Sequence, residues 1–115
     1  MSLTVYHLKT CDSCKKAIKA LTAAGKELTL IDVRADGVPS ETLAGIIEKA
    51  GWETVLNTRS TTWRGLDAAS KEGLDASKAA ALMGEHPTLI KRPVITDGET
   101  LTVGWKPDQQ AVWID

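Results

Sequence analysis

Both cysteines of this chain lie in one short motif, Cys11-Asp-Ser-Cys14, close to the N-terminus. Two thiols at this spacing can carry out thiol chemistry, bind a metal ion or simply pack in a core. Cys11 follows a strand-like run and precedes a helical pattern, so unpaired backbone N–H groups and the helix dipole should favour its thiolate. Lys9, Lys15 and Lys16 add positive charge nearby. The spacing therefore predicts that Cys11 is a nucleophile.

The alternatives differ for the two cysteines. Cys14 lies one turn further along on an apolar stripe, where it is either a resolving thiol for Cys11 or a buried packing residue. For Cys11 the alternative is an inert loop cysteine. A zinc site would need His7 and His86 as its third and fourth ligands, but the sequence has neither a second CxxC motif nor closely spaced histidines. We therefore expect no metal site.

The elements around the motif form a strand–helix–strand unit. Residues 3–8, LTVYHL, alternate and carry β-branched and aromatic side chains, which predicts a strand. Residues 12–24 place one apolar stripe at helical spacing, with Asp12 or Ser13 as the expected cap. Residues 27–33 predict a second strand. Because a helix connects the two strands, we expect them to pair in parallel.

The middle of the chain is predicted to be helical. Ser40 is expected to cap a helix that ends at Gly51, and Asp75 is expected to cap a helix whose apolar stripe runs to Met83. Between these helices, residues 57–66 read NTRSTTWRGL, which is polar and without a helical period. This stretch predicts a loop with one short helical turn.

The C-terminal part returns to strands. The segments PVIT and LTVGW flank DGE, which predicts a hairpin, and Pro107 suits the first turn of a final helix to about residue 114. The order βαβ, helices, ββα predicts an α/β fold of the thioredoxin-like type, with a mixed sheet and an all-helical insertion. We expect one domain over residues 1–115, in which 1–35 and 88–115 form the thioredoxin-like part and 36–87 form the insertion.

The composition argues against several classes of protein. A chain of 115 residues with 43% hydrophobic and 25% charged residues is typical of one globular domain. The net charge of −1 argues against direct nucleic-acid binding, and no apolar run is long enough to span a membrane. The first residues lack the pattern of a signal peptide, so we expect a cytoplasmic location. We also expect a monomer, because no helical stripe is long enough for a coiled coil.

Four stretches of the sequence resemble the ArsC/Spx/YffB family of thioredoxin-fold proteins, and in the same order. They are TCDSCKKA at 10–17, LNTRSTTWRGL at 56–66, AAALMGEHPTLIKRPVI at 79–95 and LTVGWKP at 101–107. The resemblance covers nearly the whole chain. Within the family, the runs GWE, LNTR and TTWR are most similar to the YffB-like, ArsC-related branch.

The resemblance implies roles for individual residues. Cys11 matches the cysteine of ArsC-type arsenate reductases that attacks arsenate, after which glutathione resolves the adduct. Arg59 and Arg92 match arginines that hold the oxyanion, although the residues alone favour a solvated loop arginine and a surface residue at a strand start. Lys106 stands where the family has a third arginine, and it keeps the charge but not the bidentate geometry. Pro93 matches the cis-proline opposite the active cysteine.

The family also implies how the protein would work. It would be an enzyme, a glutathione-dependent thiol oxidoreductase that acts on a small oxyanion or a glutathione adduct, with glutathione as co-substrate and glutaredoxin as a partner. We expect no bound cofactor, because the sequence has no glycine-rich phosphate loop. The alternative is a redox-sensing regulator similar to Spx, which would bind the RNA polymerase α subunit and switch through a disulfide between Cys11 and Cys14.

Overall fold

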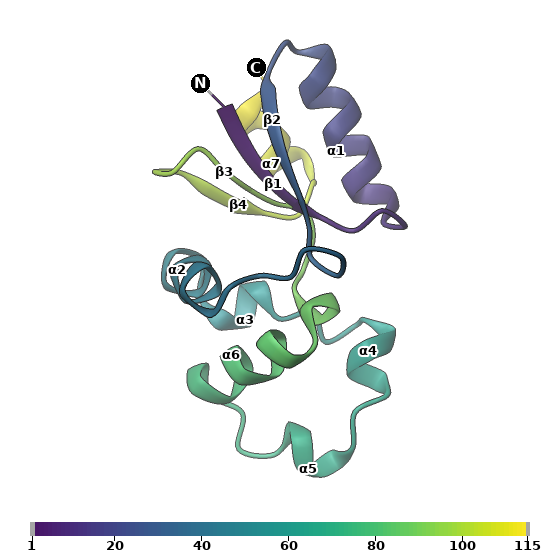
Figure 1. The fold of residues 1–115 in the computed structure, drawn as a ribbon, viewed down its shortest axis with the longest axis vertical. Coiled ribbons are helices and arrows are strands. Elements are labelled where there is room, and N and C mark those ends of the chain that lie inside the picture. The colour runs from purple at the N-terminus through teal and green to yellow at the C-terminus, as the bar shows by residue number, and fades with distance from the viewer. Residues whose placement is uncertain (1, 115) are drawn as a thin grey trace. The chain divides into compact units, whose positions relative to one another are not determined.

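The computed structural model describes residues 2–114 (Figure 1). The chain divides into two compact units. The first unit comprises the described residues of Met1–Gly37 and Arg92–Asp115, and the second unit comprises Val38–Lys91. In chain order the elements are β1 (Ser2–His7), α1 (Asp12–Ala23), β2 (Glu27–Asp32), α2 (Ser40–Ala50), α3 (Trp52–Val55), α4 (Thr61–Arg64), α5 (Ala68–Lys71), α6 (Ala76–Glu85), the 3₁₀ helix η1 (Pro87–Leu89), β3 (Val94–Thr96), β4 (Leu101–Val103) and α7 (Pro107–Trp113).

The first unit contains a four-stranded mixed sheet in the order β2-β1-β3-β4. The strands β1 and β2 pair in parallel, as the helical crossover through α1 requires. The strand β3 pairs antiparallel with both β1 and β4, so the C-terminal strands form the predicted hairpin. This βαβ and ββα arrangement with a mixed sheet confirms the predicted α/β fold.

One apolar cluster holds the helices of the first unit on its sheet. Leu3 and Val5 alternate along β1 and therefore point to the same face of the sheet. They meet Ala17 and Leu21 from α1 and Trp113 from α7 in a buried cluster. The indole Nε1–H of Trp113 also donates a hydrogen bond of 2.8 Å to the Thr102 hydroxyl of β4, so the polar atom of the ring has a partner. The cluster holds α1 on the sheet, and Cys11 directly precedes α1.

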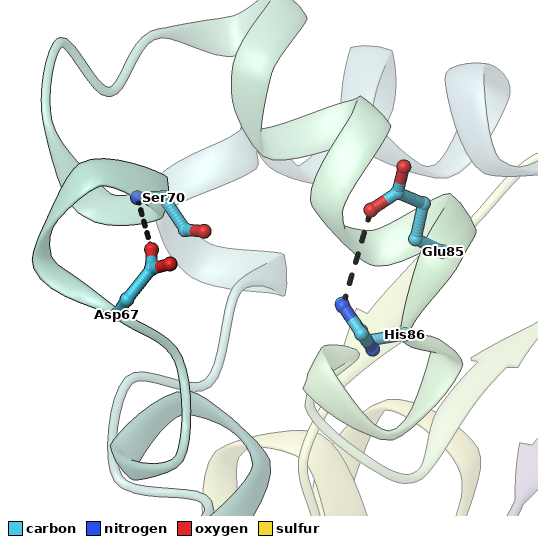
Figure 2. A network of polar contacts seen from close by, with 4 residues as sticks. All are labelled: Asp67, Ser70, Glu85 and His86. Atoms are coloured by element: carbon cyan, nitrogen blue, oxygen red, sulfur yellow. Dashed lines mark hydrogen bonds and ion pairs between the residues drawn. The ribbon is translucent and has the colours of Figure 1, made fainter.

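The second unit consists of helices. The helix α6 packs against α2, α3 and η1. The fully buried side chains in these elements include Val55, Met83 and Leu89. The Asp67 carboxylate caps α5 by accepting the Ser70 N–H at 2.8 Å (Figure 2). At the end of α6, Nε2 of His86 lies 3.9 Å from a carboxylate oxygen of Glu85.

Two expected caps are wrong. Ser40 is the first residue of α2, and Pro39 occupies the capping position because its fixed φ of −55° suits the chain just before a helix. Similarly, Cys11 itself is the N-cap of α1, so Asp12 and Ser13 lie inside the first turn. The predicted Asp75 cap is confirmed, since its Oδ1 accepts the Lys78 N–H at 2.9 Å.

Three short elements were not predicted. They are α3, α5 and η1, each of three or four residues. The predicted helical turn in the segment 57–66 is confirmed as α4, where the Ser60 side chain accepts the Trp63 N–H at 3.1 Å. Among residues 2–114, no helix combines the length and the apolar character that crossing a membrane requires.

Candidate active site

Cys11 lies at the point where the loop after β1 turns into α1. Its backbone is extended, with φ −87° and ψ 116°, which is the usual conformation of an N-cap residue. The Cys11 carbonyl accepts the Lys15 N–H at 3.1 Å, and the Cys11 N–H donates to the Leu8 carbonyl at 3.0 Å. These two bonds fix the backbone on both sides of the thiol. The Cys11 side chain is half-buried and is a free thiol.

The surroundings of Cys11 favour its thiolate. Partial burial by itself raises the pKa of the thiol, but the backbone N–H and the side chain of Cys14 hydrogen-bond to it and lower the pKa. Arg92 contributes both a hydrogen bond and its positive charge, and the net result is a pKa below the ordinary value. Cys11 thus lies at the start of a helix with a pKa below the ordinary value, and its role as a nucleophile stays a prediction.

Cys14 has the opposite character. Only 1% of its surface is exposed, and this burial is the main reason that the pKa of Cys14 is raised to about 12. The nearby Cys11 raises the pKa further, whereas the backbone N–H of Leu8 and the charge of Arg92 act in the other direction. Cys14 is therefore a buried residue that lies near Cys11, and whether it also acts as a resolving thiol stays a prediction.

Arg92 reaches the thiols because of the way β3 joins the sheet. The register places Val94 opposite Tyr6 near the end of β1, so the residues just before Val94 lie beside the loop that follows β1. The intervening Arg92–Pro93 peptide bond is cis, as the family resemblance implies. Pro93 is fully buried, and its carbonyl accepts the Gly104 N–H at 2.8 Å. Arg92, Cys11 and Cys14 thus form one site within the first unit.

The other two predicted cations occupy different places. Lys106 is the N-cap of α7 with an exposed side chain, and its backbone N–H donates to the Gln109 Oε1 at 2.9 Å. Arg59 belongs to the second unit, in the loop between α3 and α4, where its N–H donates to the Asn57 Oδ1 at 3.0 Å. The Arg59 side chain is exposed. The roles of both residues in oxyanion binding stay predictions.

Sequence reasoning missed the contribution of Leu8. Its backbone N–H points to the Cys14 sulfur and lowers the pKa of that thiol, while its carbonyl accepts the Cys11 N–H. One loop residue thus affects both cysteines. A backbone donor leaves no side-chain signature, and only the position of the residue between strand and motif could have indicated it.

In the described part of the chain, histidine, cysteine and carboxylate side chains do not gather in a group of three or more that could hold a metal ion.

These groups together can perform thiol exchange. A thiolate stabilised by a guanidinium can attack an electrophilic sulfur or the centre of an oxyanion, and a guanidinium fork matches the oxygens of such an anion. The second thiol, protonated and buried, can act later if the first becomes part of a disulfide.

Known proteins share this fold and much of this sequence. An uncharacterized protein of Haemophilus influenzae is 45% identical over 100 residues, which cover 86% of this chain and 88% of the relative. The solved structure of a YffB protein is 39% identical, covers 99% of this chain and 100% of its own, and has a TM-score of 0.93. An arsenate reductase (ArsC) related protein from Brucella melitensis is 36% identical, with coverage of 100% and 96% and a TM-score of 0.77.

A more distant relative has a regulatory name. The global transcriptional regulator Spx 1 of Lactococcus lactis is 28% identical over 109 residues, which cover 93% of this chain and 84% of the regulator. The model of the ArsC family matches residues 6–112, a stretch that includes both cysteines and all three predicted cations. The chain therefore belongs to the ArsC family.

Proposed function

We propose that this protein is a thiol-dependent reductase that couples Cys11 to glutathione and acts on an arsenate-like oxyanion or on a glutathione mixed disulfide. The observation that carries the proposal is the contact of Arg92 with Cys11, because it favours the thiolate and supplies a positive group where an anion would bind. Membership of a family with arsenate reductase-related members supports the same chemistry.

Two glutathione molecules supply the two electrons that the reduction of arsenate requires, and Cys11 is regenerated at the end. The Cys11 thiolate attacks the arsenic(V) centre and displaces one oxygen, which leaves as water after taking up protons from solvent. A glutathione thiolate then attacks the Cys11 sulfur, and the electron pair of the sulfur–arsenic bond passes to arsenic, giving arsenic(III) and a Cys11–glutathione disulfide. A second glutathione, acting through glutaredoxin, releases Cys11 and forms oxidised glutathione. On a mixed disulfide, Cys11 takes up the glutathione and frees the substrate thiol.

Coupled turnover tests this proposal. Arsenate-dependent NADPH consumption is measured with glutathione, glutaredoxin and glutathione reductase for the wild type, Cys11→Ser and Cys14→Ser. We expect turnover that Cys11→Ser abolishes. If Cys14→Ser keeps its turnover, glutathione is the thiol that resolves the Cys11 adduct. If both variants lose turnover, Cys14 is the resolving thiol. Absence of turnover in the wild type would exclude arsenate, and the same assay with a glutathione mixed disulfide then tests the other substrate class.

We also propose that Arg59 and Lys106 join Arg92 in holding the oxyanion. The support is the family pattern and the chemistry of cations toward tetrahedral anions. Replacing Arg59 or Lys106 by alanine should raise the KM for the oxyanion about tenfold, the value of one lost charge-assisted hydrogen bond. For Arg59, Arg64→Ala is the matched control, because Arg64 is an exposed arginine of the same unit as Arg59. An unchanged KM would remove the tested residue from the site.

A second function is favoured by one observation, the hydrogen bond between Cys11 and Cys14. Two thiols in contact can form a disulfide, as a regulator similar to Spx would need. We therefore propose, as the alternative, binding to the RNA polymerase α subunit controlled by this disulfide. Capture of purified α subunit by the oxidised protein, but not by the reduced protein or Cys14→Ser, would support it. Equal failure of all three proteins would exclude it.

A further inference from the structure

The segment 57–78 of the second unit has no core of its own. It contains α4 and α5, and none of these described residues is buried. Burial begins again directly on either side, since Leu56 has 4% exposure and Ala79 has 0%. Figure 1 shows the segment as a long excursion of the chain between α3 and α6. Because buried apolar surface provides most of the stability of a folded segment, another kind of contact has to hold this one in place.

The beginning of the segment is tied to η1. The Asn57 N–H donates to the Leu89 carbonyl at 2.8 Å. The hydroxyl oxygens of Thr62 in α4 and Thr88 in η1 lie 2.6 Å apart in a hydrogen bond. These contacts fix the chain up to α4, but they do not reach α5.

Two lysine side chains hold α5. Lys71, the last residue of α5, places its ammonium 5.2 Å from the ring centre of Trp63 in α4, which is a cation–π contact. Lys78 lies in the first turn of α6, and its ammonium donates to the carbonyls of Ala69 and Glu72 at the C-terminal end of α5. The last carbonyls of a helix have few partners within the helix, so a lysine from outside can supply the donor.

Lys78 connects α5 to a helix that is itself anchored in a core. The neighbouring Ala79 is fully buried, and so is Met83 one turn further along α6. Between α5 and α6 the chain turns at Gly73, whose φ of +62° is a conformation that glycine adopts without strain. The segment therefore returns to α6 through a glycine turn, and the Lys78 ammonium spans that turn.

We propose that residues 58–74 form a flap, latched to α6 by Lys78, which opens while α2, α6 and η1 stay folded. Opening breaks the two charge-assisted hydrogen bonds of Lys78 and the Thr62–Thr88 bond, but the flap contains no buried residue to expose. A segment of this kind opens at a lower free energy than the whole unit unfolds. The contact of Lys71 with Trp63 keeps α4 and α5 together, so the flap moves as one piece.

The flap has a consequence for Arg59, which lies at its beginning. The Arg59 N–H donates to the Asn57 Oδ1 at 3.0 Å, and Asn57 is tied to η1. Opening at this point changes the place of the cation that the proposed function assigns to the oxyanion. This consequence rests on the proposed function, whereas the flap itself does not.

Amide hydrogen exchange followed by NMR measures the opening without reference to activity. The flap amides to follow are those of Arg64, Gly65 and Glu72, and the reference amides are those of Leu56 and His86; all five are hydrogen-bonded to backbone carbonyls. After correction for intrinsic rates, we expect the flap amides of the wild type to exchange at least about a hundredfold faster than the reference amides.

Two lysine variants test the latch. Lys78→Met removes the ammonium and keeps the length of the side chain, so it should speed exchange of the flap amides about tenfold further and leave the reference amides unchanged. Lys91→Met removes an exposed lysine of the same unit and is the matched control, which should change neither set. If circular dichroism shows that Lys78→Met does not fold, the milder Lys78→Gln takes its place.

Three results would overturn the proposal. Equal protection of the flap and reference amides in the wild type would mean that the flap opens only when the whole unit unfolds. Flap amides without protection in the wild type would mean that no latch holds the closed form. An effect of Lys78→Met that is equal on both sets, or that Lys91→Met reproduces, would remove Lys78 as the latch.

The link to Arg59 has a readout of its own. If Arg59 holds arsenate only when the flap is closed, arsenate at about ten times its dissociation constant should slow exchange of the flap amides about tenfold. An unchanged rate would overturn the link to Arg59 and leave the flap. Absence of arsenate turnover, with the exchange results as expected, would affect only the proposed function.

Discussion

Cys11 and Cys14 belong to one motif, but their chemistry differs because their surroundings differ. Cys11 caps α1 and is half-buried beside Arg92, which favours the thiolate. Cys14 is one turn further into the helix and has 1% exposure, which favours the thiol. Because thiolate character decides which sulfur reacts first, we expect Cys11 to be the attacking thiol and Cys14 to react second if it reacts at all.

Alkylation rates should show this difference directly. With a pKa of about 12, about one Cys14 side chain in ten thousand is a thiolate at pH 8. We therefore expect iodoacetamide to modify Cys11 in Cys14→Ser at least about tenfold faster than Cys14 in Cys11→Ser, as followed by mass spectrometry. The urea-unfolded variants are the control and should react at similar rates. Comparable rates in the folded variants would contradict the assignment of Cys11 as the reactive thiol.

Arg92 should account for part of the thiolate character of Cys11. Arg92→Ala removes a hydrogen bond and a positive charge, so it should raise the pKa of Cys11 by about one unit. Arg92→Lys should give a smaller rise, because it keeps the charge but not the planar fork. The pH profile of alkylation measures both changes. Lys91→Ala removes a neighbouring exposed cation and should leave the profile unchanged. If Lys91→Ala also raised the pKa of Cys11, the effect would come from the total positive charge nearby and not from the contact with Arg92.

The sequence predicted the position of Cys11 better than that of its partners. A cysteine between a strand and a helix is recognisable because both elements have local periodic patterns. Arg92 is distant in sequence, and only the β1–β3 register brings it to the thiol. From the residues alone it resembled a surface arginine, and the family pattern supplied its role.

At the level of elements, a single side chain caps the start of each of the helices α4, α5 and α6. The Asp75 carboxylate satisfies the Lys78 N–H, which is otherwise unpaired in the first turn of α6. Asp75→Ala should lower the free energy of unfolding by about 1 kcal/mol, as measured by urea titration. Asp75→Asn, which keeps the acceptor, should change it by a few tenths at most. Equal losses in both variants would show that the charge, not the cap, stabilises this end.

Long periodic elements were predictable and short ones were not. The strands β1 and β2 and the helices α1, α2 and α6 extend over enough residues to show an apolar period. The elements α3, α5 and η1 are a single turn each and too short to show an apolar stripe of their own, and of the three only α5 has a side-chain cap. The wrong caps at α1 and α2 have a similar origin, because several neighbouring residues could each begin the helix.

For the whole molecule, the division into two units places the candidate residues in separate groups. Cys11, Cys14, Arg92 and Lys106 belong to the first unit, whereas Arg59 belongs to the second. Cys11, Cys14 and Arg92 lie close enough to change one another's ionisation, and their part in thiol exchange is a proposal. Binding of an oxyanion through Arg59 is the part of the proposed function that the arginine variants test.

The stability of the first unit should depend on the apolar cluster beneath α1 and α7. Leu21 has 0% exposure in this cluster, whereas Leu30 on the edge strand β2 is 45% exposed. The same truncation, leucine to alanine, should therefore cost about 2–5 kcal/mol at Leu21, through lost transfer energy and a cavity, and less than about 0.5 kcal/mol at Leu30. Urea unfolding followed by tryptophan fluorescence measures both values on the same chain. Similar losses at the two positions would mean that the cluster is not what holds α1 in place, and the argument that α1 fixes Cys11 would then fail as well.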